Sequence, residues 1–316
     1  MGADLTRHTI GWIGAGGRMG FAMAKRLLEA GCDVAVYNRT RSKAEPLAAL
    51  GAAVVDSPRE LRGRDIVFTT VAAADDLIAV ATGPDGVIGD DSRPALLIDC
   101  STVSEEGSDE VRRFAAARGT QVLSAPVSGN AKVVMAGKLT IVASGPQAAF
   151  DVAEPYLRAL GIGVTYVGEG EVARRVKICH NLMLGVVTQC LAEITVLAEK
   201  RGVARHAFLD FMNSSVMGSM FTRYKTPAFV NLDLKPTFTP VLLRKDLDLG
   251  LAAGQSLGVP LPLTQLTRDI VDAAVRKGHT DCDFAVLLLE QAAAAGLVLE
   301  PEHVAVDDGL SAQAVS

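Results

Sequence analysis

The sequence has few cysteines and few histidines, and neither type is spaced as a metal site requires. No two of the five cysteines form a CxxC pair, and the five histidines include no HExxH pattern. An odd number of scattered cysteines is typical of reduced thiols and not of a disulfide framework. We therefore expect a cytoplasmic protein without a bound metal.

The chain also lacks an excess of basic residues and an uninterrupted apolar stretch. Its 31 Lys and Arg residues are outnumbered by 36 Asp and Glu residues, which gives a formal net charge of −5. Nucleic acid and anionic membranes attract basic surfaces. No apolar run reaches the length of a membrane span, and the N-terminus has no signal-peptide core. We predict neither a nucleic-acid nor a membrane partner.

Hydrophobic residues are plentiful, at 49% of a 316-residue chain. This length exceeds what one core usually serves, so we expect two domains. Up to about residue 168, short apolar runs alternate with helical patterns. The expected strands are 9–14, 34–37, 53–55, 66–71, 95–99 and 121–124, and the expected helices are 18–30, 42–50, 75–82 and 105–117. This alternation predicts an α/β domain, a Rossmann-type doubly wound parallel sheet, over residues 1–168.

Residues 169–316 have a different pattern, because strand signals disappear and Leu/Ala/Val-rich helical periods replace them. The expected helices are 171–201, 204–213, 245–257, 263–277 and 283–295. We predict an all-helical substrate and dimerisation domain, joined to the first domain by the long helix 171–201. The tail from Val304 shows little periodicity, and we expect it to be frayed.

A glycine-rich turn follows the first expected strand, in the pattern Gly14-x-Gly16-x-x-x-Gly20. In dinucleotide-binding turns, glycines let backbone amides approach a pyrophosphate at a helix N-terminus. The spacing is one residue longer than GxGxxG, and we assign the extra residue to Gly17. The flanking strand and helix fall where this site needs them. The predicted contacts are Gly14, Ala15, Gly16, Arg18 and Met19.

The end of the second strand favours NADP over NAD. NAD sites usually carry an Asp or Glu there, whereas this chain has Asn38, Arg39 and Thr40. A carboxylate would repel a 2′-phosphate, but Arg39 can pair with it and Thr40 can hydrogen-bond it. We predict that the chain prefers NADP(H) and that NAD is also accepted, with all three residues in contact with the cofactor.

Lys177 and Asn181 lie one turn apart near the start of the long helix, so they share one helical face. An amine and an amide so placed can bind and deprotonate a hydroxyl group.

Five blocks of the chain together resemble the β-hydroxyacid dehydrogenases, which include 3-hydroxyisobutyrate dehydrogenase, tartronate semialdehyde reductase and 6-phosphogluconate dehydrogenase. They follow the family's order and approximate spacing: Ile13–Gly20, Asp99–Thr102, Ala125–Gly129, the block around Lys177, and Lys245–Leu247.

The resemblance implies a role for each matched position at the substrate. Lys177 corresponds to the catalytic lysine, the general acid/base of hydride transfer, and Asn181 orients the substrate. Ser128 and Gly129 hold the substrate carboxylate. Asn130 replaces a glycine common in the family, and we expect it also to contact the substrate. His180 replaces the first of the family's two asparagines, and we expect an ordinary helix residue there.

On the cofactor side, the resemblance implies contacts from Thr102 near the nicotinamide ribose and from Lys245 in the helical half. Val71 stands where the family has a Leu-Pro pair, and we predict a cofactor contact there too. Asp246 is expected to be a structural partner.

These residues together predict an NADP-preferring oxidoreductase that interconverts a small 3-hydroxy acid and its semialdehyde. Two alternatives are an imine reductase-like NADPH enzyme and a non-catalytic cofactor-binding homologue. Both would be expected to lack the lysine, so Lys177 argues against them. The apolar surface of residues 171–201 exceeds what one small helical domain needs, which predicts a homodimer or homotetramer.

Overall fold

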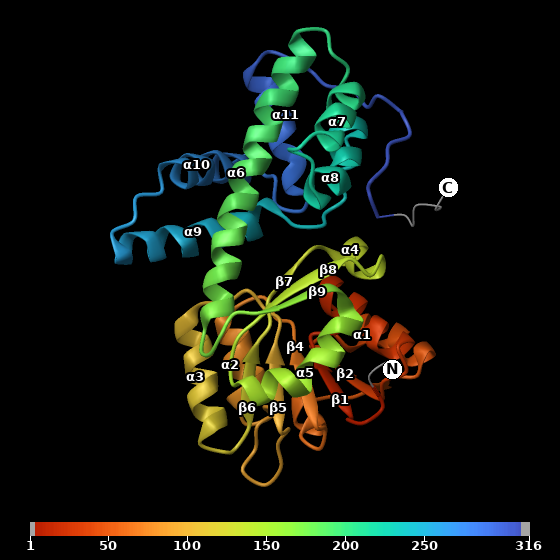
Figure 1. The fold of residues 1–316 in the computed structure, drawn as a ribbon, viewed down its shortest axis with the longest axis vertical. Helices are drawn as coiled ribbons and strands as arrows, with labels where there is room; N and C mark the ends of the chain where they lie inside the picture. Colours follow the sequence, from red (N-terminus) through yellow and green to blue (C-terminus); the bar gives the residue numbers. More distant parts are fainter. Residues whose placement is uncertain (1–3, 311–316) are drawn as a thin grey trace. The chain divides into compact units, whose positions relative to one another are not determined.

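The computed structural model describes residues 4–310 of the chain. It divides into two compact units, Met1–Lys177 and Ile178–Ser316. The sequence predicts a boundary after residue 168, and the first turns of the long helix belong to the first unit. Figure 1 shows the helices and strands of both units.

The first unit is built on a parallel sheet whose strand order is β3-β2-β1-β4-β5-β6. Because the order reverses between β1 and β4, the crevice at their carboxyl ends is where such sheets bind ligands. The strands are β1 (Ile10–Ile13), β2 (Val34–Tyr37), β3 (Ala53–Val54), β4 (Ile66–Thr69), β5 (Leu96–Asp99) and β6 (Gln121–Ser124).

Successive residues of each strand enter two different cores, one on each face of the sheet. Trp12 of β1 joins the core with α1 (Arg18–Glu29) and α5 (Gln147–Leu160), and its ring stacks on Phe68 at 4.9 Å. Ile13 joins the opposite core with α2 (Ala74–Thr82) and α3 (Glu105–Ala116). Helices on both faces confirm the predicted doubly wound fold.

Several elements of this unit differ from the prediction. A second, three-stranded sheet is formed by β7 (Val127–Ser128), β8 (Leu139–Ala143) and β9 (Gly161–Tyr166), with α4 (Ala131–Met135) after β7. The expected helix 42–50 is two 3-10 helices, Arg41–Lys43 and Glu45–Leu50, and the second has Pro46 in its first turn. A further 3-10 helix covers Pro58–Leu61.

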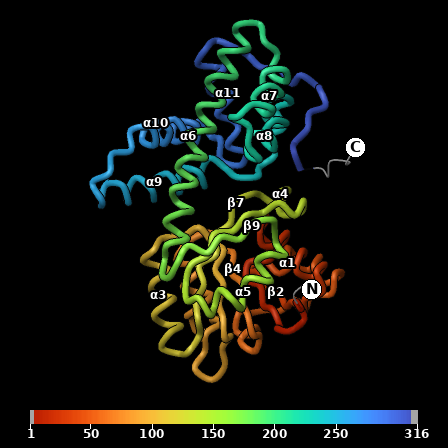
Figure 2. The backbone as a smooth tube through the Cα atoms, in the orientation of Figure 1, coloured from red at the N-terminus to blue at the C-terminus, as the bar shows by residue number. Residues whose placement is uncertain are grey.

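The second unit consists of helices, as predicted (Figure 2). Helix α6 crosses the boundary, and the 3-10 helix Phe284–Val286 precedes the last helix. The helices are α6 (Val172–Lys200), α7 (Arg205–Ser214), α8 (Met220–Asn231), α9 (Pro240–Leu257), α10 (Pro262–Arg276) and α11 (Leu287–Ala294). Helix α8 is an addition to the predicted set. Helix α9 begins earlier than expected, because Thr239 caps it and Pro240 occupies its first position.

Helix α6 has the length and hydropathy of a membrane span, with a mean hydropathy of 1.6 over its most apolar window. The expectation from the sequence concerned uninterrupted apolar runs, and polar residues such as Asn181 and Gln189 interrupt this one. Core helices of globular proteins pass the same test. Leu191, Ala192 and Val196 of α6 are buried among residues of α7, α8 and α11.

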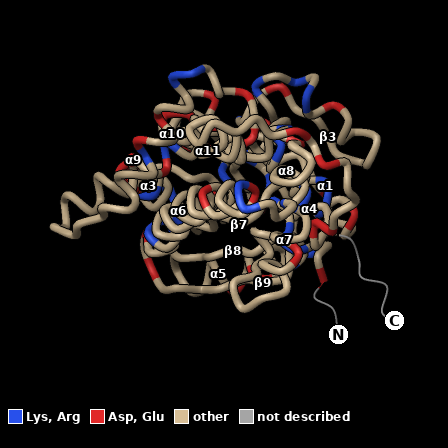
Figure 3. The backbone as a smooth tube through the Cα atoms, turned by 90° about the horizontal axis from the view of Figure 1, so that it is seen from above, with Lys and Arg blue, Asp and Glu red and all other residues tan. Residues whose placement is uncertain are grey.

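Acidic and basic residues are interspersed along the backbone (Figure 3).

The C-terminal tail is bound to α8 further along the chain than the sequence suggested. Asn231 of α8 donates to the Val304 carbonyl at 2.8 Å and accepts from the Val304 amide at 3.2 Å. Residues 311–316, the rest of the segment expected to be frayed, lie outside the described residues.

Candidate active site

The turn after β1 is held tightly against the neighbouring strands. Gly14 has a φ of +88°, and the amides of Gly14 and Ala15 donate to the Tyr37 carbonyl at 2.9 and 3.2 Å. A Cβ on Gly14 would lie 2.1 Å from the Thr70 carbonyl oxygen. Both the left-handed backbone and the close approach therefore require glycine.

The N-terminus of α1 has no side-chain cap. Gly17 is the N-cap residue in an extended conformation, and Arg18 and Met19 begin the helix. The first amides of a helix lack intrahelical acceptors, and the helix dipole favours an anion beside them. A helix N-terminus without a side-chain cap, preceded by a glycine turn, fits the pyrophosphate of a dinucleotide. Gly17, to which we assigned the extra residue of the motif, is thus the N-cap residue of α1.

Gly20, inside α1, allows the helix to approach the turn. A Cβ on Gly20 would lie 2.3 Å from the Gly14 carbonyl oxygen, whereas one on Gly17 would meet the same oxygen at 3.4 Å. We predict that Gly20→Ala destabilises the fold by about 1–3 kcal/mol through overpacking and weakens NADPH binding about 10-fold. Gly17→Ala should change neither property. Thermal unfolding and NADPH fluorescence titration test both variants, and equal behaviour would contradict the packing role of Gly20.

The three residues after β2 have different surroundings. Asn38 braces the turn, because its Oδ1 accepts from the Gly16 amide at 3.1 Å and its Nδ2 donates to the Thr40 carbonyl at 2.8 Å. The Arg39 side chain is 88% exposed and lies 3.6 Å from the Asp76 carboxylate of α2. Thr40 is exposed. Sequence reasoning missed Asp76, whose position beside Arg39 follows only from the fold.

The predicted contacts Val71 and Thr102 follow β4 and β5, whose carboxyl ends are adjacent. The two loops are joined, because the Val71 amide donates to Ser101 Oγ at 2.9 Å. Thr102 is half-buried directly after Ser101.

The predicted carboxylate-binding residues lie at the start of the second sheet. Ser128 ends β7 and is half-buried, while Gly129 has a φ of +140° and lies where a Cβ would be 2.8 Å from Val133. Asn130 is 5% exposed, and its Oδ1 caps α4 by accepting from the Val133 amide at 3.1 Å. The Asn130 side chain thus has a structural task at a position where we expected a substrate contact.

Lys177 and Asn181 are both buried on α6. Asn181 Nδ2 donates to Asp246 Oδ2 at 2.5 Å, and Asn181 Oδ1 lies 2.9 Å from His180 Nδ1. Asp246 Oδ1 is also 3.3 Å from the Lys245 amine. The Asn181 amide group is therefore held at both ends, by His180 on its own helix and by Asp246 on α9.

Two glycines let α6 and α9 pack closely enough for this contact. A Cβ on Gly250 of α9 would lie 2.3 Å from Leu182, and one on Gly185 of α6 would lie 3.1 Å from Leu247. The packing fixes the spacing between Asn181 and Asp246.

Four charged residues that the sequence did not single out form a buried network beside the first turn of α6. Arg174 pairs with Asp99 and Glu171 at 2.7 and 2.6 Å, and Arg112 pairs with Glu171 at 2.7 Å. Burial alone would raise the pKa of the Glu171 carboxyl, but Arg174 and Arg112 together hold that pKa below its usual value. The pairs Arg174–Asp99 and Arg112–Glu171 join residues far apart along the chain, which leaves no local signal for them. Within residues 4–310, no three His, Cys, Asp or Glu side chains gather as a metal site.

Comparison with known proteins identifies the protein family to which this chain belongs. Residues 9–168 match the NAD-binding domain of 6-phosphogluconate dehydrogenase, and residues 168–289 match the NAD-binding domain of NADP-dependent 3-hydroxyisobutyrate dehydrogenase. The chain belongs to the β-hydroxyacid dehydrogenase family, and it is an NAD(P)-dependent hydroxyacid dehydrogenase.

Three relatives span nearly the whole chain. The 2-(hydroxymethyl)glutarate dehydrogenase of Eubacterium barkeri is 32% identical over 89% of this chain and 95% of its own length. Glyoxylate/succinic semialdehyde reductase 2 of Arabidopsis thaliana is 30% identical over 90% and 80%. The structure of Mycobacterium tuberculosis 3-hydroxyisobutyrate dehydrogenase with L-serine has a TM-score of 0.77, 30% identity and coverages of 90% and 98%. An imine reductase of Myxococcus stipitatus, with 24% identity and a TM-score of 0.58, shares the fold.

Proposed function

We propose that this enzyme interconverts a small 3-hydroxy acid and its semialdehyde, with Lys177 as general acid/base and NADP(H) as the preferred cofactor. The observation that carries the proposal is that Lys177 and Asn181 are both buried and lie one turn apart on α6. The nicotinamide, when bound, accepts or supplies the hydride. In oxidation the neutral Lys177 amine takes the hydroxyl proton, and in reduction its ammonium form protonates the nascent alkoxide.

The other residues bind and orient the substrate. Ser128 and the backbone at Gly129 hold the carboxylate, because a hydroxyl beside backbone amides makes a small anion site. Asn181 donates to the reacting oxygen, and its anchoring by Asp246 and His180 keeps the amide in one orientation. We assign to Asn130 the task of shaping this loop through its cap of α4.

The preference for NADP(H) rests on Arg39. Its exposed guanidinium forms a surface ion pair at 3.6 Å with Asp76, and such pairs contribute little. A 2′-phosphate beside β2 can therefore recruit it. Val71, Thr102 and Lys245 complete the proposed cofactor contacts.

Imine reduction is the second candidate, because an imine reductase shares the fold. Imine reductases generally lack a lysine at the position of Lys177, and a non-catalytic homologue would have no use for it.

A substrate panel tests the proposal. NADP+ or NAD+ reduction is measured with 3-hydroxyisobutyrate, 3-hydroxypropionate and serine, and NADPH or NADH oxidation with glyoxylate, succinic semialdehyde and a cyclic imine. Turnover of a hydroxy acid or its semialdehyde, with NADP(H) favoured, is the expected result. Turnover of the imine alone would establish the second candidate instead.

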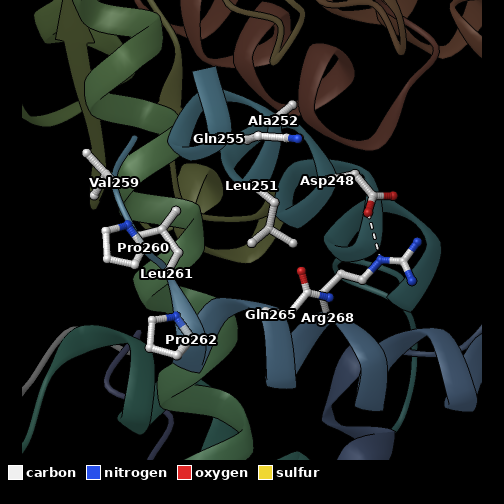
Figure 4. A pocket seen from close by; sticks show the side chains of 10 residues that line it. All are labelled: Asp248, Leu251, Ala252, Gln255, Val259, Pro260, Leu261, Pro262, Gln265 and Arg268. Carbon is white, nitrogen blue, oxygen red and sulfur yellow. Dashed lines mark hydrogen bonds and ion pairs between the residues drawn. The ribbon is translucent and has the colours of Figure 1, made fainter. Parts of the chain in front are cut away.

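We also propose a homodimer or homotetramer assembled through the helical unit. Apolar side chains on its helices are exposed, namely Met183 and Leu197 on α6, Leu257 on α9, and Leu263 and Leu266 on α10. A hollow of about 700 Å³ lies between α9 and α10, and its lining is mostly apolar. Figure 4 shows the side chains that line it, with the Asp248–Arg268 ion pair among them. We predict that light scattering after size exclusion gives a dimer or tetramer, and a monomer would contradict this assembly.

All five cysteines are free thiols, which supports a reducing compartment, the cytoplasm.

A further inference from the structure

Arg174 lies in the first turn of α6, three residues before Lys177, and only 2% of it is exposed. Each nitrogen of its guanidinium donates to a different acceptor. Nε donates to Glu171 Oε2 at 2.6 Å, Nη1 to the Ser101 carbonyl at 3.1 Å, and Nη2 to Asp99 Oδ2 at 2.7 Å. The planar guanidinium group thus holds the first turn of α6 in a fixed orientation to the end of β5.

Asp99 extends the network to the cofactor side of the sheet. Its Oδ1 accepts from Thr69 Oγ1 at 2.5 Å and from Ser101 Oγ at 2.7 Å. Ser101 Oγ in turn accepts from the Val71 amide at 2.9 Å. Hydrogen bonds therefore run without a break from the loops after β4 and β5 to the turn of α6 that precedes Lys177.

Glu171 closes the network on its other side. Arg112 of α3 donates to Glu171 Oε1 through Nε and Nη2 at 2.9 and 2.7 Å, and its Nη1 donates to the Val122 carbonyl at 2.7 Å. Ser124 Oγ donates to Glu171 Oε2 at 3.1 Å. Two carboxylates, Asp99 and Glu171, are thus balanced by two guanidinium groups.

The position of Arg174 makes this balance relevant to Lys177. Side chains three residues apart on a helix are neighbours, with Cβ atoms about 5–6 Å apart. Removing Arg174 would take a positive charge away from the residue one helical turn before Lys177, and it would leave the buried Asp99 carboxylate without its cation. An uncompensated negative charge stabilises a nearby ammonium group.

We propose that Arg174 is a positioning residue for Lys177: it ties the turn that precedes Lys177 to the loops after β4 and β5, and it cancels the buried negative charge that would otherwise favour the ammonium form. The role of Arg174 rests on the general acid/base role proposed for Lys177.

The test compares Arg174→Met with Arg175→Met. Arg175 is the adjacent residue with the same charge, but its side chain is 63% exposed and pairs with Glu105, which is 40% exposed. We expect Arg174→Met to lower kcat about 10-fold while KM for NADPH changes little, because misplacement of a catalytic group slows the chemical step. The half-maximal pH for oxidation should rise by about one unit. Arg175→Met should move neither quantity. Equal pH profiles for the two variants would overturn the proposal.

A second variant separates the effect of the tether that Arg174 forms from the effect of the buried charge. It also provides a control in case Arg174→Met does not fold. Asp99→Asn/Arg174→Met removes one buried charge of each sign and leaves Glu171 paired with Arg112. It should return the half-maximal pH to near the wild-type value while kcat stays about 10-fold low, because the tether is absent. Full recovery of kcat would overturn the positioning role.

A substrate-free measurement keeps this test separate from the proposed function. Acetic anhydride labels neutral amines, so the labelling of the Lys177 peptide, followed by mass spectrometry across pH, titrates that amine directly. Arg174→Met should shift the labelling midpoint upward by about one unit relative to Arg175→Met. An unchanged midpoint overturns the inference even if Lys177 proves catalytic. If the midpoint shifts but Lys177→Ala retains activity, the proposed lysine mechanism has failed instead.

Discussion

Replacing Lys177 by alanine is expected to lower kcat by about 10²–10⁴-fold, which is the usual contribution of a positioned general acid or base. The methyl group of alanine can neither take the hydroxyl proton during oxidation nor return one to the alkoxide during reduction. Both directions should therefore lose rate. The loss should appear in kcat and kcat/KM together, since the proton transfer belongs to the transition state.

The matched control is Lys200→Ala, which removes the same side chain from the exposed C-terminal end of the same helix. Its kcat should equal that of the wild type. Thermal unfolding and NADPH fluorescence titration show whether Lys177→Ala folds and binds cofactor. A folded Lys177→Ala variant with near-wild-type turnover would remove the lysine from the mechanism and reopen the imine reductase and non-catalytic alternatives.

The fold was predictable where the pattern is local. In β1, Trp12 and Ile13 enter opposite cores, and each parallel strand is short, apolar and followed by a helical period. The elements that escaped prediction lack such a pattern. Strand β9 contains two glycines and exposes Ile162, and α8 contains Pro227 in its interior. Strand β9 is determined by its pairing with β8 and not by its own pattern, and in α8 the interior proline conceals a helix that Ser219 caps.

The candidate site divides in the same way. The turn at Gly14 depends on residues close together in the chain, and so does the shared helical face of Lys177 and Asn181. Spacing alone therefore predicted both features. The pairing of Arg174 with Asp99 joins residues 75 positions apart. Asn181 and Asp246 are 65 positions apart. Such contacts exist only after the sheet and the helices have formed, so the residues that hold the site could not be found from spacing.

Asn130 has a structural role that its place in the motif did not predict. Its position in the loop suggested a substrate contact, which stays a prediction, and its buried side chain caps α4. Replacement of a glycine can change the loop's structure without adding a ligand contact. Any difference in specificity that arises at Asn130 would then act through the backbone of Ser128 and Gly129.

Replacing Arg39 by aspartate is expected to reverse the cofactor preference. Loss of a charge-assisted hydrogen bond to the 2′-phosphate costs about 1.5–3 kcal/mol, and a carboxylate at this position would also repel the phosphate. The same carboxylate can accept hydrogen bonds from the ribose hydroxyls of NADH. We therefore expect the ratio of kcat/KM for NADPH to that for NADH to fall by on the order of 10²-fold, measured with one substrate under initial-rate conditions.

Arg41 provides the control for this prediction, because it lies in the same loop and carries the same charge. Its guanidinium already pairs with Asp56 at 2.7 Å and with Glu45 at 3.6 Å, whereas Arg39 pairs with Asp76 at 3.6 Å. Arg39→Ala should lower kcat/KM for NADPH and leave that for NADH nearly unchanged, while Arg41→Ala should affect both equally or not at all. Two results would show that Arg39 does not select the phosphate. One is a wild-type kcat/KM for NADH equal to or above that for NADPH, and the other is an Arg39→Ala variant whose kcat/KM falls equally for both cofactors.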